Sequence, residues 1–331
     1  MAYETGTATT PGNLLVKLFD FAAANGWTID DDIADDTKAS QQGSIHKNNV
    51  YLMFYFDTVR IQMYPARGFT NASTAPGAHP ESGSDRSTGY NHGLYVYFDT
   101  GPYDSYHFFE DDNYIHIVVN TDGLVYRHFG FGESIKSSNW LGGEYYYGHP
   151  WFADGSGYAA SPSSDRNSGP FNHTVRGYEG MLVYGKQVGG AALPGAQEAG
   201  SKWGFVDSDA NQTLYLDPDG DSYNRFYNLS SAKGGITGRI LGTGASTFNG
   251  YVPLVPLQYG LYDTIPAPAN VYFLGTYPDV RACNISALAP EAEHVIGDDT
   301  WVVFPMTRKV YVDNTTQWSG GYGLAYKKII T

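Results

Sequence analysis

Helical periodicity occurs only once in this chain of 331 residues, close to its start. Thr10 can cap a helix that begins at Pro11, and Asn25-Gly26 suits its end. Five apolar residues recur between these signals at helical spacing, so one face of the helix should pack on a sheet. They are Leu14, Leu15, Leu18, Phe21 and Ala22.

The rest of the sequence has the patterns of strands and loops. Residues 50–56 are apolar or aromatic at every position, which predicts a strand covered on both faces. Residues 115–119 alternate, residues 121–123 can turn and residues 124–129 return, which predicts a hairpin. Stretches without a period, such as residues 65–92, are long and rich in Gly, Ser, Pro and Asn. We therefore predict a mostly β fold with sandwich-like sheets, one N-terminal helix and long irregular loops.

Changes in this pattern along the chain suggest three segments. A helix and a β core with long loops are expected over residues 1–184, and an irregular or β insertion over residues 185–268. The last segment, residues 269–331, has three longer strand candidates that should complete the core. No internal repeat of fixed period is visible.

Composition excludes several classes of protein. Charged residues are only 16% and hydrophobic residues 42%, so the chain is not disordered. The net charge of −14 argues against nucleic acid as the main partner. We expect no membrane insertion, because no apolar run of the required length occurs. We also expect no secretory signal, because no basic segment followed by an apolar one opens the chain. Cys283 is the only cysteine, which rules out an intramolecular disulfide and fits folding in a reducing cytosol.

Aromatic residues are the most unusual part of the composition. The chain has 28 Tyr, 17 Phe and 6 Trp, so many tyrosines should lie where one end of the ring stays wet. Protein interfaces and carbohydrate-binding surfaces both have this character. Composition alone does not separate the two.

An acidic stretch is the candidate metal site. Asp217, Asp219 and Asp221 alternate around Gly220, and oxygen ligands at every second position can converge on Ca²⁺. The calcium-hand pattern is incomplete, because its final Glu is absent. The alternative is a solvated turn between strands. No other cofactor is expected.

Catalytic candidates are weaker. His116 and His128 could face each other across the predicted hairpin, although a structural histidine is the better interpretation. Glu110 and Asp112 could serve as the paired carboxylates of a polysaccharide hydrolase, or form a charged turn. No phosphate-binding loop and no serine-nucleophile motif occur.

Three stretches together resemble a family of tailed-bacteriophage virion structural proteins of the tail or baseplate type. The first, residues 3–32, has a short extended arm, the amphipathic helix and Asn-Gly-Trp before a strand. The second is residues 123–148, and the third is residues 277–309 with "GYGLAYKK" after it. The second stretch carries Tyr126, His128, Phe131, Gly132, Glu133, Trp140, Gly142 and Gly143.

The resemblance implies a non-enzymatic structural component of the virion, at the tail tip, baseplate or collar, assembled in the host bacterial cytoplasm. Its partners would be copies of itself and other virion proteins. Residues 1–10 could add a strand to the sheet of a neighbour. The expected contact residues are Tyr3, Trp140, Tyr145, Tyr146, Tyr147 and Trp151, with a local aromatic core as the alternative. A receptor- or glycan-binding module and a polysaccharide hydrolase are the alternative functions.

Overall fold

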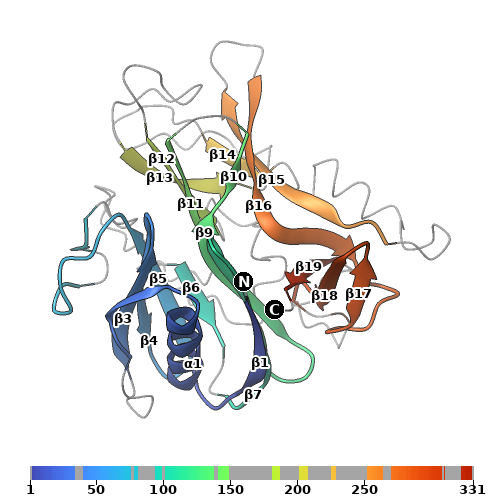
Figure 1. The fold of residues 1–331 in the computed structure, drawn as a ribbon, viewed down its shortest axis with the longest axis horizontal. Helices are drawn as coiled ribbons and strands as arrows, with labels where there is room; N and C mark the ends of the chain where they lie inside the picture. Colours follow the sequence, from blue (N-terminus) through green and yellow to red (C-terminus); the bar gives the residue numbers. More distant parts are fainter. Residues whose placement is uncertain are drawn as a thin grey trace, which may run out of the picture. The chain divides into compact units, whose positions relative to one another are not determined.

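The computed structural model is mostly β and, in the part of the chain that it describes, contains a single helix (Figure 1). This confirms the predicted fold class. The described residues are 2–33, 40–75, 78–80, 94–98, 101–137, 141–148, 181–186, 201–207, 225–228, 252–263, 270–307, 309 and 322–329. No helix within these ranges is long and apolar enough to cross a membrane.

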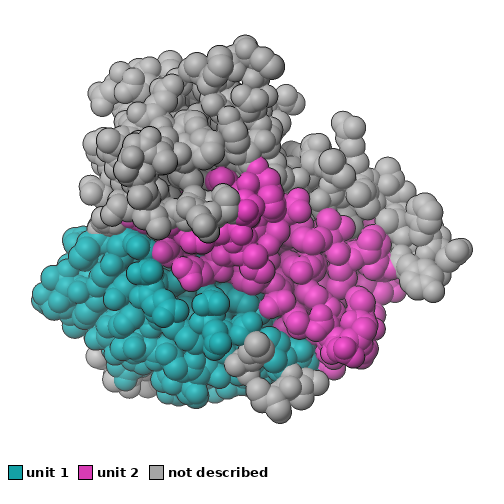
Figure 2. Space-filling model, turned by 45° about the horizontal axis from the view of Figure 1, so that its top comes forward, with its two compact units in different colours: residues 1–132, 146–165, 328–331 teal, residues 133–145, 166–327 magenta. Residues whose placement is uncertain are grey.

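The chain divides into two compact units, coloured teal and magenta in Figure 2. Unit 1 comprises residues 1–132, 146–165 and 328–331, and unit 2 comprises residues 133–145 and 166–327. This division differs from the three predicted segments. Unit 2 takes in the whole middle segment and nearly all of the C-terminal one.

Unit 1 begins with strand β1 and then the helix α1, Pro11–Ala24. The helix starts and ends where the sequence predicts. The Thr10 side chain accepts a hydrogen bond from the Asn13 N–H at 3.0 Å, and Asn25 caps the other end. The predicted apolar face is confirmed, since all five of its residues are buried.

The strands of unit 1 form two sheets. A five-stranded antiparallel sheet has the order β2-β3-β4-β5-β6, and the other strands follow the order β1-β7-β8-β9. The bounds are β1 Ala2–Ala8, β2 Thr28–Asp31, β3 Gln41–Lys47, β4 Val50–Phe56, β5 Arg60–Ala66, β6 Leu94–Tyr97, β7 Tyr103–Asp111, β8 Tyr114–Asn120 and β9 Tyr126–Glu133. Strands β8 and β9 are the predicted hairpin.

Aromatic side chains join α1 to both sheets of unit 1. Phe19 of the helix packs edge-on against Phe54 of β4, with ring centroids 5.6 Å apart. Phe21 packs against Phe108 of β7 at 5.4 Å. Phe54 also meets Phe131 of β9, 5.8 Å away. The core of unit 1 therefore lies between the two sheets and includes the apolar face of α1.

Gly130 allows a close approach in this core. A Cβ atom at this position would lie 2.8 Å from the Ile115 carbonyl oxygen and 2.7 Å from Cε1 of Tyr147. Any larger residue would push the β8 backbone and this ring apart. The glycine is thus explained by packing between neighbouring strands.

The strands of unit 2 follow the order β12-β13-β14-β15-β16-β19-β18-β17, and β10 pairs with β16. Strands β13 and β14 pair in parallel. The bounds are β10 Ile135–Lys136, β11 Leu141–Gly148, β12 Met181–Lys186, β13 Ser201–Asp207, β14 Arg225–Asn228, β15 Val255–Asp263, β16 Asn270–Asn284, β17 Glu293–Ile296, β18 Asp299–Pro305 and β19 Tyr322–Lys328. Strand β11 passes from unit 2 to unit 1 after Tyr145, and β19 does so after Lys327.

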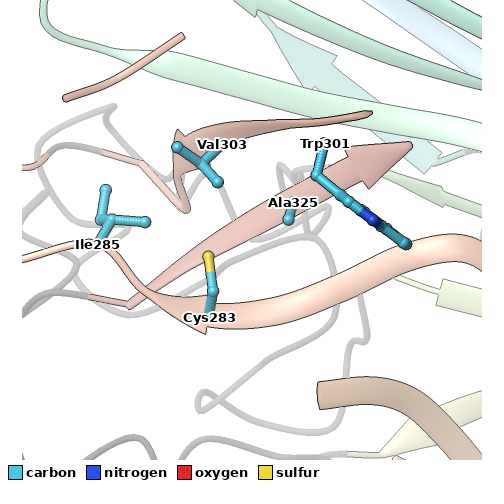
Figure 3. Close-up of a cluster of buried hydrophobic side chains, with 5 residues drawn as sticks. All are labelled: Cys283, Ile285, Trp301, Val303 and Ala325. Atoms are coloured by element: carbon cyan, nitrogen blue, oxygen red, sulfur yellow. The ribbon is translucent and has the colours of Figure 1, made fainter. Parts of the chain in front are cut away.

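An apolar cluster from β16, β18 and β19 and from the residue after β16 forms part of the core of unit 2 (Figure 3). Its members are Cys283, Ile285, Trp301, Val303 and Ala325. The guanidinium of Arg281 lies 5.3 Å from the centre of the Trp301 ring. The cysteine therefore serves as a small apolar side chain in this core.

Cys283 should be inert in the folded protein. The side chain is 0% exposed, and burial raises the pKa of its thiol to about 12. Only the thiolate attacks disulfide reagents. We expect Ellman's reagent at pH 8 to react about 100-fold more slowly with the native protein than with the urea-unfolded protein. Rapid reaction of the native protein would contradict the packing in Figure 3.

Candidate functional site

Three of the predicted contact residues are buried in the fold. Tyr145, Tyr146 and Tyr147 are 1%, 0% and 0% exposed. Within unit 2, Tyr145 packs edge-on against Tyr277, at 5.1 Å between ring centroids. Burial raises the pKa of Tyr145 and of Tyr146 well above the usual value. The interface prediction is corrected for these three residues, because the local aromatic core describes them.

Tyr3 occupies a different environment. It is half-buried on β1, and its hydroxyl lies 2.9 Å from Nδ1 of His107 on β7. The Lys328 ammonium lies 4.5 Å from the centre of its ring, and Phe109 packs at 5.2 Å. Residues 2–8 thus pair within their own chain, in place of the arm expected to reach a neighbour.

Several predicted residues lie outside the described ranges. These are Trp140, Trp151, Asp217, Asp219 and Asp221. The calcium prediction therefore stays a prediction. Among the residues that the structure describes, no group of three or more His, Cys, Asp and Glu side chains is arranged to hold a metal ion.

The two hairpin histidines are not directly opposite each other. His116 pairs with Gly130, and His128 pairs with Val118, so they are diagonal neighbours. Both are 0% exposed. Nδ1 of His116 lies 2.8 Å from the Tyr147 hydroxyl. His116 thus has the structural role that the sequence favoured.

The two candidate carboxylates have different surroundings. Glu110 is 1% exposed, and its Oε1 lies 3.2 Å from Nζ of Lys47. Asp112 is exposed in the turn after β7. The Glu110 carboxylate is therefore engaged in a buried ion pair within unit 1. The structure does not bring the two acids to one open surface.

One face of the five-stranded sheet points away from α1 and carries polar and aromatic side chains. The inner face carries buried residues such as Ile45 and Leu52, which are 0% and 1% exposed. Side chains alternate along β3, so His46 and Ser44 belong to the other face. His46 is flanked by Thr28 on β2 and Tyr51 on β4. We call this surface the outer face.

His46 is held from two directions. Oδ2 of Asp30 lies 2.7 Å from its Nδ1, and the Tyr51 ring stacks on it, 4.5 Å away and tilted by 11°. The His46 side chain is 24% exposed and that of Asp30 is 14% exposed. A carboxylate at Nδ1 favours the tautomer that carries its proton there and leaves Nε2 as an acceptor.

A β-bulge supplies this aspartate. Ile29 pairs with Ile45 and Asp31 with Ser44, so Asp30 is the extra residue on β2. Bulges re-aim side chains and occur often beside functional sites. Sequence reading missed the pair, because a bulge and a strand register carry no local signal in residues 16 positions apart.

A loop after β5, which includes Phe69, Ala72 and His79, covers the other part of the outer face. Phe69 packs on a small cluster of Met53, Tyr64 and Ala66. The Gln42 side-chain amide donates to the Ala72 carbonyl of this loop. His79 stacks on Phe69 at 5.1 Å, and its Nδ1 accepts the Thr70 N–H at 3.2 Å. His79 therefore holds the loop in place only when its imidazole is neutral, since an imidazolium has no hydrogen-bond acceptor.

Stability should depend on pH through His79. Burial lowers the pKa of His79 from 6.5, against the opposing effects of the Thr74 carbonyl and Asp30. The unfolded chain therefore binds the proton more readily, and the stabilisation is complete above pH 6.5. It should be lost as the pH falls through the lowered value.

We expect His79→Gln to flatten the dependence of the urea midpoint on pH between pH 7.5 and 5, because glutamine keeps an acceptor but does not titrate. His294→Gln in unit 2 is the control for the general effect of replacing a histidine by glutamine. An identical slope in the His79 variant would show that His79 does not control the loop.

No protein-family model matches the sequence, and no curated protein matches it.

Proposed function

We propose that this protein is a structural component of a tailed-bacteriophage virion, at the tail tip, baseplate or collar. It would act as a homo-oligomer that packs against other virion proteins after synthesis in the host cytoplasm. The proposal requires no catalysis.

The first support is the sequence resemblance, and the position of the resembling stretches in the fold is consistent with a framework role. The second stretch contributes Tyr126, His128 and Phe131 to the core of unit 1, where they are 4%, 0% and 0% exposed. The third stretch contains Cys283 and Trp301 of the cluster in unit 2. Residues that maintain a fold are the ones that relatives with different contacts would share.

The observation that best supports a role in assembly is the edge of strand β1. Strand β1 stands at the end of its strand order, so one of its edges has no strand partner among the described residues. It is seven residues long and contains neither lysine nor proline, the residues that commonly protect sheet edges. Such an edge can accept a strand from a neighbouring subunit.

Electron microscopy of purified particles is the decisive experiment. A gold-labelled antibody against this chain should bind intact virions at one fixed position of the tail. Light scattering of the purified protein should give a mass several times that of one 36.2 kDa chain. A monomer that is absent from purified particles would overturn the proposal.

A further inference from the structure

We propose that the open part of the outer face, built by Thr28, Asp31, His46 and Tyr51, binds a neutral saccharide. This ligand site goes beyond the structural role and does not depend on it. All of these residues belong to unit 1.

The first step is the fixed orientation of His46. A ring stacked on Tyr51 and hydrogen-bonded to Asp30 has little rotational freedom left. The Nε2 atom of His46 accepts no hydrogen bond from the described residues, and it is not buried. Nε2 therefore faces solvent as a preorganised acceptor, which lowers the entropic cost of binding a ligand.

The second step is the set of groups around this acceptor. Thr28 is exposed directly across from His46, and its hydroxyl can donate and accept. Asp31 follows on the same strand and contributes a carboxylate that accepts only. These groups match the closely spaced hydroxyls of a sugar ring.

The charge and the aromatic residues of this surface restrict the class of ligand further. Three consecutive aspartates, Asp30, Asp31 and Asp32, make this part of the surface acidic, so it repels anions. The Asp30 carboxylate is already engaged by His46. Tyr51 and the half-buried Tyr55 lie on the same side of β4 and offer amphipathic rings. Neutral ligands with hydroxyls on one side and C–H groups on the other suit this combination.

Saturation-transfer NMR would test the site with three neutral oligosaccharides, built from N-acetylglucosamine, galactose and rhamnose. The titrations are done in EDTA, so that a bridging metal ion cannot account for binding. At least one oligosaccharide should bind the full chain. His46→Ala and Asp31→Asn should each raise its Kd about tenfold.

His294→Ala and Asp112→Asn are the matched controls and should leave the Kd unchanged. Asp31→Asn removes no side-chain hydrogen bond or ion pair among the described residues, so its melting curve should match that of the parent protein and exclude unfolding as the cause. The assignment is overturned if none of the three oligosaccharides binds, or if binding is equal in the parent and in the His46 and Asp31 variants.

Discussion

Replacing Lys47 by methionine should lower the free energy of unfolding by about 3–5 kcal/mol, because the change removes the cation beside a buried carboxylate. Nζ of Lys47 lies 3.2 Å from Oε1 of Glu110, whose side chain is 1% exposed. The same ammonium donates to the Asn25 carbonyl at 3.1 Å and lies 5.7 Å from the centre of the Trp27 ring. Methionine keeps the apolar stem, so urea unfolding would measure mainly the lost charge.

Two further variants separate this ion pair from general damage. Lys17→Met, on the outside of α1, should cost less than about 1 kcal/mol, as for other half-exposed lysines. The double variant Lys47→Met with Glu110→Leu should recover most of the stability, because both buried charges are then removed together. If Lys47→Met proves as harmless as Lys17→Met, the pair contributes no more than a surface ion pair does.

Local signals in the sequence were sufficient for the helix and for the β8–β9 hairpin. Thr10, Pro11 and Asn25 act within a few residues of themselves, and the structure places each at the predicted end of α1. The turn at residues 121–123 is likewise a short-range signal: the Asp122 carboxylate accepts the Leu124 N–H at 3.0 Å. Such features need no knowledge of the rest of the fold.

Burial of the tyrosines could not be predicted in the same way. The sequence shows three consecutive tyrosines, but whether they face water depends on partners far along the chain. Tyr145 meets Tyr277, which stacks on Tyr259, and Tyr147 meets His116. Tyrosine suits wet and buried positions equally well when its hydroxyl finds a partner. Only the strand order decides between them.

The Asp30–His46 pair was hidden for a related reason. A stretch of three aspartates at residues 30–32 is typical of a solvated turn. One extra residue in β2 changes which of these acids reaches His46. Register and bulges are set by the pairing of whole strands, so a one-residue difference is invisible until the sheet is known.

Deleting residues 1–10 should lower the free energy of unfolding by about 3 kcal/mol, and the melting temperature by about 6–12 °C. An arm that paired only with a neighbour, as the sequence suggested for residues 1–10, would leave the melting temperature of the monomer unchanged when removed. In the structure the same residues form β1, and Thr10 caps α1, a contribution of about 1 kcal/mol. Tyr106 donates to Glu4 at 2.7 Å, and the Tyr3 hydroxyl meets His107, each bond contributing about 1 kcal/mol.

Point variants distinguish the internal role of β1 from its role as an edge. Tyr3→Phe should lose about 1 kcal/mol, because it removes the hydrogen bond to His107. Thr7→Lys places a charge at an exposed position of β1 and should weaken assembly with little effect on melting, since lysine on an edge blocks strand addition. If the deletion abolishes assembly while the melting curve stays that of the parent protein, β1 belongs to a neighbour's sheet in the particle, and its pairing with β7 is not the state that assembles.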